Sequence, residues 1–91
     1  MSISVKVPTI LRSYTGGTSE VAVSGSTLSD ALADLEAQYP GIGARVLDDD
    51  GRLRRFINVY VNDDDVRFLE DLDTPTPDGS SVAIIPAVAG G

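Results

Sequence analysis

The residues best suited to chemistry in this chain are the last two, Gly90 and Gly91. Glycine makes up about 7% of average sequences, so a Gly-Gly end arises by chance in roughly one chain in 200. Because glycine has no side chain, such an end can enter a narrow enzyme channel with its terminal carboxylate leading. That carboxylate is inert until it is activated, and it is then an acyl group carried by a protein. Taken alone, the same pattern also fits a frayed terminus.

A nucleophile with its own base is not indicated elsewhere in the sequence. The chain has neither Cys nor His, which leaves a Ser-Lys pair as the remaining arrangement for nucleophilic catalysis. The single lysine, Lys6, falls at an outward position of a predicted strand, on the same side as Ser2 and Ser4. A serine-rich strand surface is ordinary, so the sequence predicts no catalytic residue and a protein that is not an enzyme.

Two aspartate triplets, Asp48–Asp50 and Asp63–Asp65, raise the question of a metal site. An EF-hand loop with its glycine at Gly51 would need ligands at Val46 and Ile57, and neither side chain can supply one. Solvated polar turns explain the triplets better, with loose binding of a divalent ion as the alternative. We therefore predict no metal site and no cofactor bound by this chain. By elimination, the α-carboxylate of Gly91 is the candidate reactive group.

The charge balance excludes nucleic acid and indicates a protein partner. Fourteen acidic residues against seven basic ones give a net charge of −7, whereas nucleic-acid binding requires clustered Lys and Arg. The short cluster of Arg52, Arg54 and Arg55 lies between the aspartate triplets, and we interpret it as a solvated approach to a strand. The overall acidity favours a partner with a basic docking face, and salt should weaken that attraction.

The sequence predicts a soluble cytoplasmic protein with no membrane association. Its start, Met1 to Val7, lacks the basic and apolar regions of a signal peptide, and no apolar run approaches the ~20 residues that cross a bilayer. The absence of Cys fits a reducing compartment. Ninety-one residues, 42% of them hydrophobic, suit one domain with one core.

The elements that must position the terminus follow from the hydrophobic periodicity. Alternation and β-branched content predict strands at residues 3–7, 20–23, 56–61, 66–68 and 82–85, the last ended by Pro86. Residues 56–61 are almost continuously apolar and therefore predict a central strand buried on both faces. A helix should begin after an N-cap at Thr27, with Asp30 completing a capping box, and should end at Pro40. The remaining stretches predict loops, with a short helical turn near residues 44–47.

This order, β-β-α-β-β-β, predicts an α+β fold of the β-grasp type. We expect a mixed sheet of about five strands, with one main helix packed on one face and the first and last strands parallel neighbours. Residues 1–86 would form this domain. Residues 87–91 would be a flexible C-terminal tail, able to extend roughly 17 Å from the last strand.

The whole chain resembles the ubiquitin-like sulfur carriers of the MoaD/ThiS family. Within that family it is similar to the carriers of thiocarboxylate-dependent cysteine biosynthesis. The tail indicates the family, and the stretches around Pro8–Gly17 and Asn58–Phe68 favour the cysteine branch, whereas Glu70–Asp73 departs from the pattern. The resemblance is carried by the segments 7–12, 15–17, 55–63, 65–68 and 85–91.

The resemblance implies three partner enzymes and a role for each tail residue. An E1-like enzyme would adenylate Gly91 with ATP and install sulfur, giving a thiocarboxylate. A PLP-dependent cysteine synthase would accept the tail, and the sulfur would attack its bound aminoacrylate; a zinc peptidase would then release cysteine. Gly91 would carry the sulfur and Gly90 would allow entry to the channel, while Ala87, Val88 and Ala89 would contact its walls. ATP, PLP and zinc would belong to the partners.

Two other functions stay open on the sequence. The carrier could supply sulfur to molybdopterin, thiamin, a thiolated tRNA base or a secondary metabolite. Alternatively, the chain could be a ubiquitin-like modifier whose tail forms isopeptide bonds with target lysines. Both begin with the same adenylate, so the tail alone does not separate them.

Overall fold

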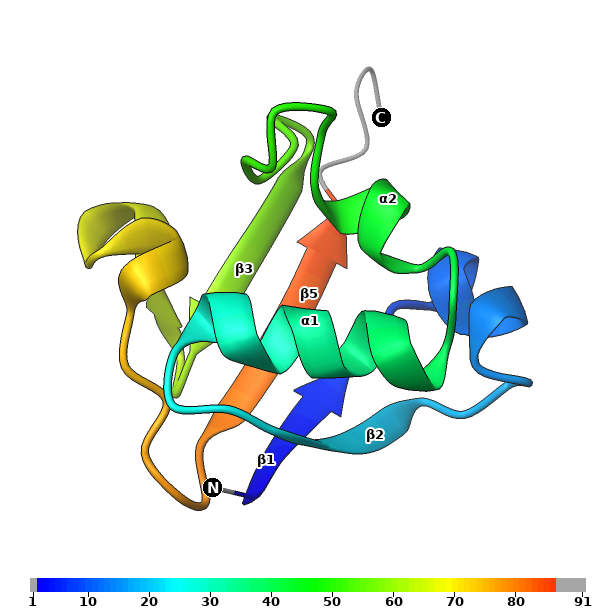
Figure 1. The fold of residues 1–91 in the computed structure, drawn as a ribbon, viewed down its shortest axis with the longest axis horizontal. Helices are drawn as coiled ribbons and strands as arrows, with labels where there is room; N and C mark the ends of the chain where they lie inside the picture. Colours follow the sequence, from blue (N-terminus) through cyan, green and yellow to red (C-terminus); the bar gives the residue numbers. More distant parts are fainter. Residues whose placement is uncertain (1, 87–91) are drawn as a thin grey trace.

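The computed structural model describes residues 2–86, which form one mixed sheet covered on one face by a helix (Figure 1). The strands lie in the order β2-β1-β5-β3-β4, with β1 and β5 parallel and the other pairs antiparallel. This is the predicted α+β arrangement, and the first and last strands are the expected parallel neighbours. Three 3-10 helices, η1 (Thr9–Tyr14), η2 (Val66–Phe68) and η3 (Asp71–Asp73), lie in the connections. The strands are β1 (Ser2–Lys6), β2 (Glu20–Ser24), β3 (Ile57–Val61), β4 (Asp64–Asp65) and β5 (Ser81–Pro86), and the helices are α1 (Leu28–Gln38) and α2 (Gly43–Val46).

Alternation along the strands places one side of the sheet in the core. Every second residue of β1, β2, β3 and β5 is buried beneath α1, because successive side chains point to opposite faces of a sheet. The apolar stripe of α1 completes the core with Leu28, Ala31, Leu32 and Leu35, all at most 3% exposed. The buried strand residues are Ile3, Val5, Val21, Val23, Ile57, Val59, Val61, Val82 and Ile84.

The start of α1 confirms the predicted N-cap. The Thr27 hydroxyl oxygen accepts a hydrogen bond from the backbone N–H of Asp30 at 3.2 Å, and so satisfies one of the free donors of the first turn. The N–H of Leu28 donates to the carbonyl of Thr74 at 2.9 Å. The entry to the helix is therefore fixed both locally and by the segment that leads into β5. The predicted helical turn near residues 44–47 is also present, as α2.

Two expectations about the strands are wrong, those for residues 56–61 and 66–68. β3 begins at Ile57 and lies beside the central β5; Phe56 is exposed, while Asn58 and Tyr60 are only half-buried, because α1 covers just one face of the sheet. Residues 66–68 form η2 instead of a strand, because the Asp65 carboxylate accepts the N–H of Arg67 at 2.9 Å and bends the chain. The expected loops at residues 9–19 and 72–77 contain η1 and the end of η3. Pro86 closes β5 from within the strand, in register with Ile57.

No helix within residues 2–86 has the length and apolar character needed to cross a bilayer.

Candidate functional site

The tail residues predicted to act, Ala87, Val88, Ala89, Gly90 and Gly91, lie outside the described residues. What the structure describes is the strand that presents them. β5 is the central strand of the sheet, held by β1 on one side and β3 on the other, and its side chains Val82 and Ile84 are 0% and 2% exposed. Pro86, the last described residue, directly precedes the tail. The tail is therefore attached to the most firmly held strand of the domain.

The surroundings of Pro86 combine apolar side chains with arginines. Ile57 lies opposite Pro86 in the β3–β5 register, and Asn58 lies opposite Ile85. Ile57 also lines a surface depression of about 350 Å³ together with Ile10 and Leu11 of η1, Arg45 of α2, and Arg54. Ile10, Phe56 and Ile85 are large apolar side chains that stay 66%, 55% and 47% exposed. Large apolar side chains that stay exposed are candidates for a protein-binding surface.

Arg67 holds this end of the sheet in place. Its Nη1 donates to Asn58 Oδ1 at 2.7 Å, and its Nη2 donates to the carbonyls of Ile57 and Arg54 at 2.8 and 3.0 Å. These bonds connect η2 to the start of β3, which in turn pairs with the end of β5. Arg67 thereby fixes the strand that faces Pro86. Sequence reasoning assigned it no role, although it lies in the 65–68 segment that carries the family resemblance.

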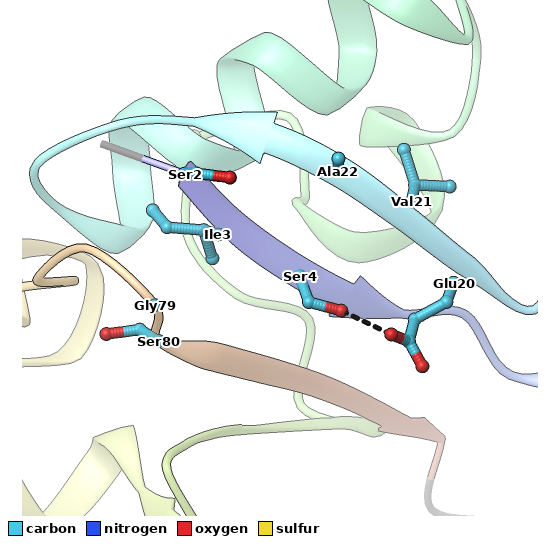
Figure 2. A pocket seen from close by; sticks show the side chains of 8 residues that line it. All are labelled: Ser2, Ile3, Ser4, Glu20, Val21, Ala22, Gly79 and Ser80. Atoms are coloured by element: carbon cyan, nitrogen blue, oxygen red, sulfur yellow. Dashed lines mark hydrogen bonds between the residues drawn. The ribbon is translucent and has the colours of Figure 1, made fainter.

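A second depression, of about 400 Å³, lies between β1 and β2 near Gly79 and Ser80 (Figure 2). The serine considered for catalysis, Ser4, donates its hydroxyl hydrogen here to Glu20 Oε1 at 2.7 Å. The side chain of Ser4 is thus hydrogen-bonded to a carboxylate and not to Lys6. Within residues 2–86, no three His, Cys, Asp or Glu side chains are grouped so as to hold a metal ion.

Comparison with known proteins extends these observations to the tail. Residues 5–91 match the ThiS family. The sulfur carrier protein CysO of Mycobacterium tuberculosis (strain ATCC 25618 / H37Rv) is 54% identical over 93 residues, covering 100% of both chains.

Solved structures are similar over the same extent. A crystal structure of the Amycolatopsis orientalis BexX/CysO complex contains a chain 47% identical to this one with a TM-score of 0.92, covering 98% of this chain and 99% of that one. The solution structure of small archaeal modifier protein 1 from Methanosarcina acetivorans is 31% identical with a TM-score of 0.83, covering 99% and 96%. The chain therefore belongs to the ThiS family and is a small sulfur carrier of the ubiquitin-like β-grasp fold, a protein on which enzymes act rather than an enzyme itself.

Proposed function

We propose that the C-terminal carboxylate of Gly91 is adenylated, converted to a thiocarboxylate, and used to deliver sulfur to a PLP-dependent cysteine synthase. The observation that carries this proposal is the extent of the similarity: the family match runs through Gly91, and the similarity to the mycobacterial sulfur carrier covers both chains completely. The central position of β5, which leads directly into the tail, supports it.

The chemistry requires a partner at every step. A carboxylate oxygen of Gly91 would attack the α-phosphorus of ATP, so that pyrophosphate leaves and an acyl adenylate forms. A sulfur nucleophile would then displace AMP and leave sulfur in place of one carboxylate oxygen. An E1-like enzyme would supply both steps, the synthase would take the sulfur into cysteine, and a zinc peptidase would release the product from Gly91. Gly90 would pass through the channel of each enzyme, with Ala87, Val88 and Ala89 against its walls.

Intact-protein mass spectrometry tests this proposal. The chain is expressed in its own host with its native C-terminus, and a second sample is incubated with host extract, ATP and sulfide. A species heavier by the difference between sulfur and oxygen would demonstrate the thiocarboxylate, and an additional cysteinyl mass would identify the cysteine pathway. A chain that keeps its unmodified mass under both conditions would refute the proposal. A variant lacking Gly91 is the control for modification elsewhere in the chain.

Protein modification is a second candidate because of the similarity to small archaeal modifier protein 1. In that function the same adenylate would end in an isopeptide bond between Gly91 and a lysine of a target. Lys6, the single lysine of this chain, is exposed but offers at most one site for self-conjugation. Digestion of host extract with trypsin and a search for lysine residues carrying the C-terminal residues of the chain would detect conjugates. Sulfur transfer to another acceptor, such as molybdopterin, thiamin or tRNA, would give the thiocarboxylate without the cysteinyl adduct.

A further inference from the structure

The chain is acidic overall, yet the end of the sheet from which the tail leaves carries a group of arginines. We define the arginine rim as Arg45, Arg54, Arg55 and Arg67. Arg45 and Arg54 line the depression beside η1 together with Ile57, the residue that lies opposite Pro86 in the β3–β5 register. A neighbouring depression of about 210 Å³ is lined by Arg54, Arg55, Phe56 and Asp48. Arg67 reaches the same segment through its bonds to the carbonyls of Arg54 and Ile57.

The side-chain hydrogen bonds of the rim, made by Arg54 and Arg67, all go to uncharged acceptors. Arg54 donates through Nε to the carbonyl of Ala44 at 2.9 Å, and Arg67 donates to two backbone carbonyls and the amide oxygen of Asn58. All of these acceptors are neutral. A guanidinium that donates only to uncharged acceptors keeps its positive charge, so it can still pair with a carboxylate of a partner.

Of the nearby aspartates, Asp48 lines the same depression as Arg54 and Arg55. The Asp48 carboxylate accepts the N–H groups of Asp50 and Arg52 at 2.9 and 3.0 Å, within its own loop. Asp48 and Asp49 line a third depression, which faces Ser29 and Glu36 on the α1 side of the molecule. Asp48 therefore lines both depressions, whereas Asp49 lines only the one on the α1 side and Arg54 and Arg55 only the one beside Phe56. Figure 1 shows this loop and α2 at the same end of the sheet as the arrowhead of β5.

Acidic groups also occupy the opposite end of the sheet. Asp63, in the turn after β3, and Asp64, the first residue of β4, lie at the far end of β3 from Ile57. Asp78 precedes β5 and accepts the backbone N–H of Ser2 at 2.7 Å. The arginine rim therefore lies at the end of the sheet away from Asp63, Asp64 and Asp78, and the loop of Asp48 shares its end.

We infer that the arginine rim, with the exposed side chains of Ile10, Phe56 and Ile85, docks on a carboxylate-lined surface at the mouth of the tail channel of the adenylating enzyme. This inference rests on the function proposed above. An interface that combines arginines with large apolar side chains has the composition of a specific protein contact. Nucleic acid fits less well, because the net charge of −7 opposes a polyanion. The adenylating enzyme is the common partner of every function considered, so the rim would act before the pathways diverge.

Initial-rate kinetics with the adenylating enzyme encoded in the same genome test the inference. The substrate variant is Arg45→Gln/Arg55→Gln, because both side chains are exposed and, within residues 2–86, neither holds the fold through a side-chain hydrogen bond. The control, Ser29→Glu/Ala37→Glu, makes the same change in net charge at exposed positions of α1. Rates of ATP-dependent pyrophosphate release are measured at low and high salt, and thermal unfolding verifies that each variant is folded.

We expect the rim variant to lose about tenfold or more in kcat/KM at low salt, mainly through KM, and to lose much of the salt dependence of the wild type. The control should behave as the wild type. Equal rates and equal salt dependence for the wild type and the rim variant would overturn the inference while leaving the proposed function intact. Equal losses in the rim variant and the control would also overturn it, because net charge alone would then explain the effect. Failure of the wild type to be adenylated would refute the proposed function and this inference with it.

Discussion

At the scale of single residues, the proposed chemistry depends on one atom group, the α-carboxylate of Gly91. The core residues all lie between Ile3 and Ile84, before the tail in the sequence. Substitutions in the tail should therefore change the proposed activity without changing stability.

Deletion of Gly91, or addition of one residue after it, should abolish ATP-dependent modification of the chain. The deletion shortens the tail by one residue, so the terminal carboxylate no longer reaches the same position in the channel of the adenylating enzyme. The addition converts the carboxylate of Gly91 into a peptide bond. Neither removes a core contact, so the midpoint of urea unfolding should stay unchanged. Mass spectrometry after incubation with host extract and ATP measures the modification. A thiocarboxylate on either variant would contradict the assignment.

Gly90→Val should block modification by sterics alone. A β-branched side chain adds bulk directly before the reacting carboxylate, in a channel proposed to be narrow. Ala22→Val is the matched control, because it places the same side chain at an exposed position of β2. We expect the control to be modified at the wild-type rate. Gly90→Val should lose most or all of its ATP-dependent modification. Comparable rates for the two variants would show that the channel does not select for glycine.

At the scale of elements, the position of α2 depends on a carboxylate of α1. Glu36 accepts the N–H groups of Gly41 at 2.9 Å and Gly43 at 2.7 Å, and so joins the end of α1 to the start of α2. A Cβ at Gly43 would lie 2.7 Å from Glu36 Oε1, so a larger residue there would displace this carboxylate. Because α2 carries Arg45, the same contact positions one member of the arginine rim.

Glu36→Ala should lower the free energy of unfolding by about 1–3 kcal/mol, because backbone donors lose a charged acceptor. Glu36→Gln keeps one acceptor oxygen and should lose less. Urea unfolding followed by circular dichroism gives both values. If Glu36→Ala and the wild type unfold at the same urea concentration, solvent satisfies these N–H groups equally well and the contact does not stabilise the fold.

At the scale of the whole molecule, stability and function should separate, because the core lies beneath α1 whereas the tail leaves at the end of the sheet. Leu32, 3% exposed, packs in that core. Leu32→Ala should cost about 2–5 kcal/mol of unfolding free energy, yet the folded fraction should be adenylated at the wild-type rate. Rates measured at a temperature where both proteins are folded test this. A slower adenylation rate for folded Leu32→Ala would show that core packing affects how the tail reacts.

The sequence alone was sufficient to predict the β-grasp order, the N-cap of α1, the parallel pairing of the first and last strands, and the family. The period of two along β1 and the Thr27–Asp30 spacing are local signals. The parallel pairing and the family instead came from the order of the elements and from the resemblance of separate segments, the last of which ends at Gly91. The assignment of Gly91 itself stays a prediction, because residues 87–91 lie outside the described part of the chain.

Only the tertiary structure decided which face of β3 is buried and where the charges lie. The apolar run at residues 56–61 predicted burial on both faces, but a single helix covers a single face, and Asn58 and Tyr60 stay half-buried on the other. The arginines of residues 45–67 alternate with aspartates in sequence, so net charge and local spacing predicted only solvated turns. In the fold, Arg67 donates to the carbonyls of Arg54 and Ile57, and Ile57 lies opposite Pro86 in the β3–β5 register, while the Asp48 carboxylate accepts hydrogen bonds within its own loop. Strand pairing between distant segments places these charges, and local sequence does not encode that placement.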